Sequence, residues 1–120
     1  MVKVLVVDDS SLTRAILTKT LMEAGHSVVS AGNGKTAMDV FTVERPELVL
    51  TDLMMPEMDG IELAKLIRAR DNKVPIILLS AEFNKEIKLR SEKVGINDYL
   101  FKNFEKKDLL RKVETLLERR

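Results

Sequence analysis

The sequence predicts an α/β protein in which one parallel sheet carries helices on both faces. Five short runs of apolar and β-branched residues punctuate the chain, and amphipathic stretches lie between and after them. This alternation favours a doubly wound fold with right-handed crossovers between parallel strands. The length of 120 residues suits one domain, and no linker or repeat interrupts it. We therefore expect a single domain over residues 1–120.

The expected strands are the apolar runs themselves. They cover residues 2–7, 27–31, 47–51, 75–80 and 97–101. Three of these runs are apolar almost throughout, which is typical of strands that are covered on both faces.

The stretches behind the strands predict five helices. The first ends at Gly25, a residue type that often closes a helix, and the second ends before Pro46. The third begins behind Asp59, a good N-cap residue. The fourth, around residues 83–94, has the weakest apolar stripe and many charges. In the last, apolar residues recur at i, i+4, i+7 and i+8 from Leu109.

Composition excludes several classes of protein. The 20 basic and 19 acidic residues give a net charge of +1, which offers no field for direct nucleic-acid or membrane binding. The absence of cysteine excludes disulfides and zinc–thiolate sites. The N-terminal MVKVLVVDD is too short and too soon acidic for a signal peptide, and no apolar run approaches membrane-spanning length. We expect a cytoplasmic protein.

Polar side chains follow four of the expected strands, at the edge where ligands bind in such sheets. Asp8 and Asp9 follow the first strand, Asp52 the third, Ser80 closes the fourth, and Lys102 stands just past the fifth. Each alone is explained as a helix cap or a solvated side chain. Together, at one edge, they indicate a functional site.

The charges of this group indicate its chemistry. Three carboxylates repel one another, and Lys102 offsets only one of them. Oxygen ligands suit Mg²⁺, which would make the site nearly neutral and able to accept a phosphoryl group. In such a reaction Asp52 can act as the nucleophile, Lys102 can stabilise charge, and the Ser80 hydroxyl can donate a hydrogen bond.

These residues stand in a recognisable order. The chain resembles the receiver domain of two-component response regulators, in particular the chemotaxis receivers, along essentially its full length. The marks are the acidic pair in VVDDS, the segment DLMMPEMDG from Asp52, the SA pair at Ser80, and the YLFK run that ends at Lys102. The resemblance implies a (βα)5 flavodoxin-like domain with the strand order 2-1-3-4-5. It also implies a phosphorelay switch that assists its own phosphorylation and dephosphorylation and is no enzyme toward a separate metabolite.

The resemblance also assigns roles within the acidic group. Asp52 would accept phosphate from a phosphohistidine of a sensor histidine kinase or a histidine phosphotransfer protein. Asp9 would ligate Mg²⁺ directly and Asp8 mostly through water, and the backbone carbonyl of Met54 would complete the protein's share. Kinase docking in this family uses the first helix and nearby loops, which suggests Leu12, Arg14 and Ala15 as contacts.

Ser80 and Tyr99 match the family's switch pair, in which the hydroxyl turns toward the phosphoryl group and the ring moves inward. The alternative for Tyr99 is an ordinary strand aromatic at a sheet edge. The face formed by the fourth helix, fifth strand and fifth helix would then act on a downstream target protein or on an output domain.

Two further side chains match positions that set how long the phosphate stays. Met54 and Glu82 lie two residues beyond Asp52 and Ser80. We expect the bulky Met54 to obstruct hydrolytic water, whereas Glu82 either positions that water or repels the phosphate.

One residue departs from the family pattern. Family members usually carry proline, with a cis peptide, after the lysine, but here Asn103 follows Lys102. A cis bond before a residue other than proline costs about 3 kcal/mol. Either the fold bears that strain, or the loop is trans and Lys102 sits differently. The departure keeps open an alternative function, a receiver-like interaction module that does not depend on phosphorylation.

The segment GNGKT at residues 32–36 raises a third possibility, because nucleotide-hydrolysing proteins carry a phosphate loop that ends in the same letters. The first glycine of that loop would fall at Val29, inside an expected strand. We therefore interpret GNGKT as a turn that starts a helix. His26, the only histidine, is expected to lie solvated in a loop.

Overall fold

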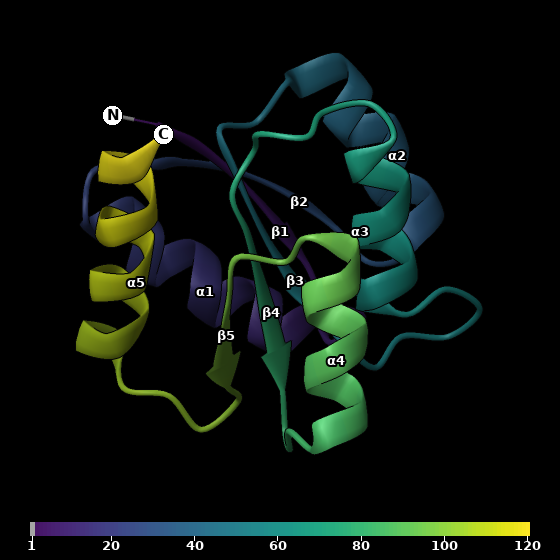
Figure 1. Cartoon of the computed structure of the whole chain (residues 1–120). Helices are drawn as coiled ribbons and strands as arrows, with labels where there is room; N and C mark the ends of the chain where they lie inside the picture. The colour runs from purple at the N-terminus through teal and green to yellow at the C-terminus, as the bar shows by residue number, and fades with distance from the viewer. Residues whose placement is uncertain (1) are drawn as a thin grey trace.

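The computed structural model describes residues 2–120, which form a central sheet with helices on both sides (Figure 1). The elements in chain order are β1 (Lys3–Val7), α1 (Ser11–Glu23), β2 (Ser27–Ala31), α2 (Gly34–Glu44), β3 (Leu48–Asp52), α3 (Gly60–Arg68), β4 (Ile76–Ser80), α4 (Lys85–Val94), β5 (Asp98–Phe101) and α5 (Lys106–Arg119). Each strand begins and ends within one residue of the predicted run. None of the helices described has the length and apolar character needed to cross a membrane.

All strands are parallel, and their order in the sheet is β2-β1-β3-β4-β5. Helices α1 and α5 cover one face, and α2, α3 and α4 cover the other (Figure 1). The predicted doubly wound, flavodoxin-like fold with the strand order 2-1-3-4-5 is thereby confirmed. Because β1 and β3 are neighbours at the centre, the side chains at their carboxyl ends meet.

The two faces of β1 explain why its sequence is continuously apolar. Val4 and Val6 pack in the cluster beneath α1 and α5, whereas Leu5 and Val7 pack in the cluster beneath α2 and α3. Alternate residues of a strand point to opposite faces, so a strand buried on both faces needs apolar residues throughout. Full burial of such a side chain contributes about 1.5–3 kcal/mol.

Helix ends follow their local sequence. Asp59 caps α3 in a reciprocal box: its carboxylate accepts from the Glu62 N–H at 2.8 Å, and Glu62 accepts from the Asp59 N–H at 2.9 Å. Asn33 caps α2 by accepting from the Thr36 N–H at 2.8 Å. The interpretation of GNGKT as a turn and helix start is therefore confirmed.

Helix α4 packs least deeply against the sheet, as its weak apolar stripe predicts. None of its residues is buried, whereas α3 buries five. It begins at Lys85 because Asn84 serves as its N-cap. Arg68 of α3 holds its other end by donating twice to the Gly95 carbonyl, at 3.1 and 2.9 Å.

The expectation that His26 is solvated was wrong. Gly25 adopts a left-handed conformation with φ of 93°, and the His26 N–H turns back to the Leu21 carbonyl at 3.1 Å. The imidazole is consequently buried, with Nε2 3.3 Å from Oε1 of Glu114 in α5. A loop position in the sequence did not reveal that the turn aims this ring at α5.

Candidate functional site

Three carboxylates converge at the carboxyl ends of β1 and β3. Asp8 and Asp52 are buried, with exposed fractions of 0% and 1%, and Asp9 is exposed. One oxygen from each of the three lies within 4.8 Å of those from the others. The fold thus gathers side chains that are 44 positions apart (52 minus 8) into one acidic cluster, which we define as Asp8, Asp9 and Asp52.

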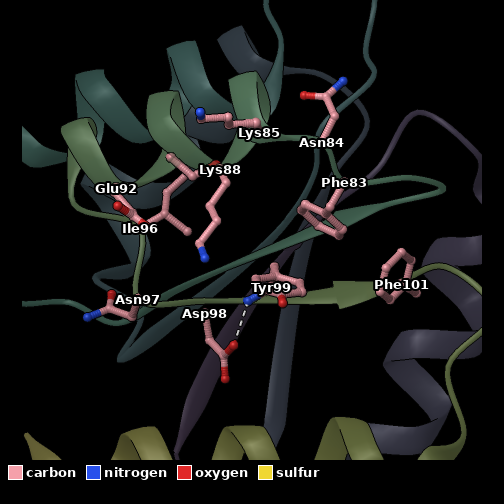
Figure 2. A pocket seen from close by; sticks show the side chains of 11 residues that line it. Phe83, Asn84, Lys85, Lys88, Glu92, Ile96, Asn97, Asp98, Tyr99 and Phe101 are labelled. Carbon is pink, nitrogen blue, oxygen red and sulfur yellow. Dashed lines mark hydrogen bonds between the residues drawn. The ribbon is translucent and has the colours of Figure 1, made fainter.

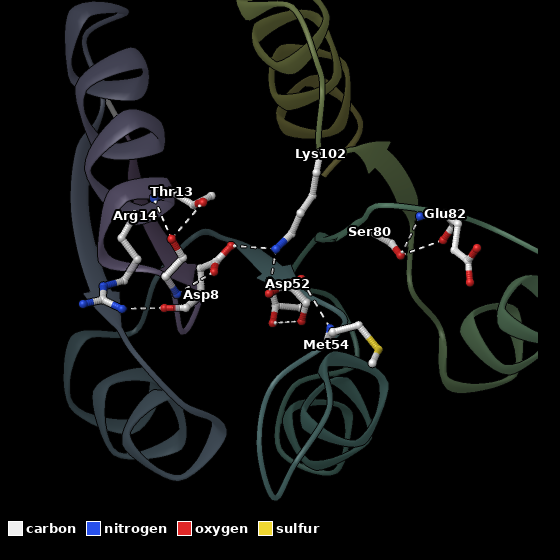
Figure 3. A network of polar contacts seen from close by, with 10 residues as sticks. Asp8, Thr13, Arg14, Asp52, Met54, Ser80, Glu82 and Lys102 are labelled. Carbon is white, nitrogen blue, oxygen red and sulfur yellow. Dashed lines mark hydrogen bonds and ion pairs between the residues drawn. The ribbon is translucent and has the colours of Figure 1, made fainter.

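Lys102 reaches this acidic cluster from the end of β5 (Figure 3). Its Nζ lies 3.0 Å from Oδ2 of Asp52 and 3.7 Å from Oδ2 of Asp8. All peptide bonds in residues 2–120 are trans, including the one between Lys102 and Asn103. The backbone N–H of Lys102 donates to the Ser80 carbonyl at 3.0 Å, which fixes the loop on β4. Of the two geometries considered for this loop, the structure has the trans peptide. The Lys102 side chain nevertheless contacts Asp52.

The electrostatics of the site make an added cation favourable. Burial raises the pKa of Asp52, the nearby Asp8 charge raises it further, and the hydrogen bond from Lys102 opposes both. Partial burial lowers the pKa of Lys102, but the hydrogen bond to Asp52 and the acidic charges outweigh burial and raise it overall. Oδ2 of Asp8 is buried and accepts no hydrogen bond from residues 2–120. This all-oxygen set with one orphaned carboxylate oxygen fits a hard divalent cation such as Mg²⁺.

The loop between β3 and α3 closes over Asp52. The Met54 N–H donates to Oδ1 of Asp52 at 3.3 Å, while the Met54 side chain is 71% exposed. Gly60 lies so close to the Asp52 carbonyl that a Cβ at position 60 would clash with it. The requirement for Gly60 was missed from the sequence, although a glycine directly behind an N-cap was the available signal.

Ser80 faces away from the acidic cluster. Its buried hydroxyl donates to the Glu82 carbonyl at 2.6 Å, and the two are drawn together in Figure 3. The Glu82 side chain is exposed. Ser80 is therefore at the predicted edge of the sheet, but its oxygen has another partner here.

Tyr99 lies outside the acidic cluster, on the outer strand β5. It is 44% exposed, its ring centroid lies 4.4 Å from that of Phe83, and Phe101 meets it edge-on at 6.3 Å. Nζ of Lys112 lies 5.3 Å from the centre of the Tyr99 ring. These aromatic rings line a groove between α4 and β5 (Figure 2), which also carries Lys88.

Comparison with known proteins gives one family. Residues 4–114 match the model of the response regulator receiver domain. The chain is 36% identical over 118 residues to the response regulator MprA of Mycolicibacterium vanbaalenii, an alignment that covers 98% of this chain and 51% of the relative. A probable transcriptional regulator, ycf27 of Guillardia theta, is 38% identical over 117 residues, covering 98% of this chain and 46% of the relative. The chain thus spans about half the length of these curated relatives.

Solved structures agree with these relatives. The chemotaxis protein CheY4 of Vibrio cholerae superposes with a TM-score of 0.94 at 33% identity, covering 97% of this chain and 98% of that one. The receiver domain of the Francisella response regulator 1452 has a TM-score of 0.91 at 34% identity, covering 99% and 98%. With its acidic cluster, its lysine and its fold, the chain belongs to the receiver domains of two-component response regulators.

Proposed function

We propose that Asp52 is a phosphoacceptor and that the domain is a signalling switch. The observation that carries the proposal is a buried carboxylate at a strand end, held by Lys102 at 3.0 Å beside two further carboxylates. A carboxylate oxygen of Asp52 attacks the phosphorus of a phosphohistidine, and a P–O bond forms as the P–N bond breaks. The leaving imidazole keeps the electron pair and takes a proton. The donor is a sensor histidine kinase or a histidine phosphotransfer protein.

The acidic cluster and the backbone carbonyl of Met54 would hold Mg²⁺. The ion would supply positive charge to the phosphoryl oxygens, which otherwise meet three carboxylates. The orphaned Oδ2 of Asp8 supports this assignment, because a buried carboxylate oxygen without a hydrogen bond is costly unless something binds it.

Lys102 and Ser80 complete the catalytic group. Lys102 already donates to Asp52 and would move its hydrogen bond to a phosphoryl oxygen. Ser80 would rotate its hydroxyl from the Glu82 carbonyl toward the phosphoryl group. Loss of the hydrogen bond between the Ser80 hydroxyl and the Glu82 carbonyl would loosen the segment at Glu82 that leads into α4.

Tyr99 would follow Ser80 as the second member of the switch pair. Its ring is partly exposed and packs against Phe83, which stands between Ser80 and α4. A shift of this segment would reshape the face of α4, β5 and α5, where the groove of Figure 2 lies. A downstream target protein or an attached output domain would respond to that face.

Residues 1–120 would act as one receiver unit. The family match over residues 4–114 and the continuous cores on both sides of the sheet support this extent. Met54 and Glu82 flank the site from two loops, and both side chains are exposed, so we assign to them the lifetime of the phosphoryl group.

The deciding experiment treats the protein with Mg²⁺ and a small acyl phosphate and measures its intact mass. The expected result is one added phosphoryl group on the wild type and none on Asp52→Asn. A wild type that gains no mass would favour the phosphorylation-independent interaction module. Phosphate released only from ATP, without an adduct, would favour an NTPase instead.

A further inference from the structure

Arg14, in the first turns of α1, directs its guanidinium back toward the loop that carries the acidic pair. Its Nη1 donates to the backbone carbonyl of Asp8 at 2.6 Å (Figure 3). The same nitrogen lies over Gly32 in the loop between β2 and α2, where an added Cβ would come within 3.2 Å of it. The absence of a side chain at Gly32 thus leaves room for the guanidinium.

Asp8 is restrained at every polar atom except one. Its N–H donates to the Ala31 carbonyl at 3.2 Å, and its carbonyl accepts from Arg14. Its Oδ1 accepts from the Ser10 N–H at 2.9 Å. Among the polar atoms of Asp8, only Oδ2 lacks a hydrogen bond within residues 2–120; it is buried and lies 3.7 Å from Nζ of Lys102. The hydrogen bonds that hold the Asp8 peptide, together with the one from Ser10 to Oδ1, thus set the direction of Oδ2.

We propose that Arg14 is a positioning residue, which fixes the peptide of Asp8 so that Oδ2 points into the acidic cluster and thereby raises the cluster's affinity for a divalent cation. The inference rests on the proposed function, because it concerns the same metal site. A charge-assisted hydrogen bond from a planar guanidinium restrains a carbonyl more firmly than a neutral donor does. Groups that orient metal ligands from behind change metal affinity by about 10- to 100-fold when they are removed.

The sign of the effect separates positioning from simple electrostatics. Arg14 is a cation near three carboxylates, so removal of its charge alone would strengthen the binding of Mg²⁺. Loss of positioning would weaken that binding. The two explanations therefore predict opposite changes in the dissociation constant for Mg²⁺.

The experiment is calorimetric titration of metal-free protein with Mg²⁺. Arg14→Gln should bind Mg²⁺ on the order of tenfold more weakly than wild type. Arg14→Lys, which keeps the charge but replaces the planar fork with a single donor nitrogen, should lie between them. The matched control is Lys19→Gln, which removes an exposed charge from the same helix without touching Asp8. It should bind Mg²⁺ as well as wild type or slightly better. Equal or tighter binding by Arg14→Gln would overturn the inference.

A second variant keeps the test usable if Arg14→Gln folds poorly. Gly32→Ala crowds Nη1 of Arg14 and leaves the arginine in place. It should weaken Mg²⁺ binding on its own and have no further effect in an Arg14→Gln background, because both changes act through one contact. Unchanged affinity in Gly32→Ala alone, or simple additivity in the double variant, would contradict the proposed role. A wild type that binds no Mg²⁺ would instead remove the metal part of the proposed function, and this inference with it.

Discussion

At the scale of single residues, the ionised side chain of Asp52 is electrostatically unfavourable in the metal-free protein. This side chain is buried beside Asp8, and Nζ of Lys102 lies 3.0 Å from its Oδ2. A buried carboxylate that serves a reaction is commonly held in an environment that destabilises it in the free protein. Stability measurements on metal-free protein can reveal this cost without any assay of activity.

Asp52→Asn should stabilise the metal-free domain at neutral pH. The pKa of Asp52 is raised above its ordinary value of 3.8, mainly by burial, so folding favours the protonated form. The stability due to this group is present below pH 3.8 and is lost as the pH rises through the folded pKa. At pH 7 the free energy of unfolding of the variant should exceed that of the wild type, because the wild type then carries a charge that burial disfavours.

Urea denaturation in a chelator at pH 7 and near pH 4 would measure this difference. The advantage of Asp52→Asn should shrink at the lower pH, because the wild-type carboxyl then takes up a proton more readily in the folded than in the unfolded state. Asp39→Asn, at an exposed position on α2, is the control and should change little. A variant less stable than wild type at pH 7 would show that the Lys102 contact outweighs the burial of the charge.

Met54→Asn should shorten the lifetime of phosphorylated protein. The Met54 side chain stands 71% exposed above Asp52, where its bulk can obstruct water on the way to the phosphorus. A shorter, hydrogen-bonding side chain opens that path, and we expect phosphate loss to accelerate several-fold. The measurement is the decay of the phosphorylated mass after the acyl phosphate is removed. An unchanged decay would assign the lifetime to other groups, Glu82 among them.

Some contacts of the site could be predicted from the sequence, and others could not. Asp8, Asp9, Asp52 and Lys102 could be predicted to meet, because parallel strands place their carboxyl ends at one edge and each residue follows such an end. The contact of Arg14 with the Asp8 carbonyl could not be predicted from the sequence, because it depends on the rotamer of a long side chain.

At the scale of elements, local sequence and burial agree for most of the chain. The inner strands were predictable because residues apolar on both faces fit only a sheet covered twice. The end of α4 was less predictable, since its attachment comes from Arg68 of another helix and not from an apolar stripe of its own. The burial of His26 could not be predicted either, because Glu114, which contacts its ring, lies in α5, far away in the sequence.

Arg68→Ala should loosen α4 more than the rest of the fold. The guanidinium gives two hydrogen bonds to the Gly95 carbonyl and one to Oδ1 of Asn97, while α4 itself has no buried residue. Hydrogen bonds from a charged group contribute about 1.5–3 kcal/mol, less where water competes. Amides of α4 should therefore exchange roughly tenfold faster, as a loss of about 1.4 kcal/mol implies.

Hydrogen exchange followed by mass spectrometry or NMR would map this change. Lys65→Ala, at an exposed position on the same helix α3, removes a charge without touching α4 and is the matched control. Faster exchange spread evenly over all helices would mean that Arg68 supports the whole fold and not α4 in particular.

At the scale of the whole molecule, the acidic cluster exists only when the sheet is formed. Its members come from the ends of β1 and β3, and Lys102 comes from the end of β5. An ion that binds the folded state and not the unfolded chain stabilises the entire domain by mass action. Mg²⁺ at ten times its dissociation constant should raise the free energy of unfolding by about 1.4 kcal/mol. The melting temperature should then rise by roughly 5 °C for a domain of this size.

Thermal unfolding with and without Mg²⁺, at matched ionic strength, would measure that linkage. Asp8→Asn should lose most of the shift, because Oδ2 of Asp8 is a buried carboxylate oxygen that accepts no hydrogen bond within residues 2–120. Lys102→Gln should enlarge it, since the lysine Nζ competes with the ion for Asp52 and Asp8. These opposite responses from two contacting residues are specific to a cation bound among the carboxylates. A shift that is equal in all three proteins would instead reflect general screening of surface charge, and would place the ion outside the cluster.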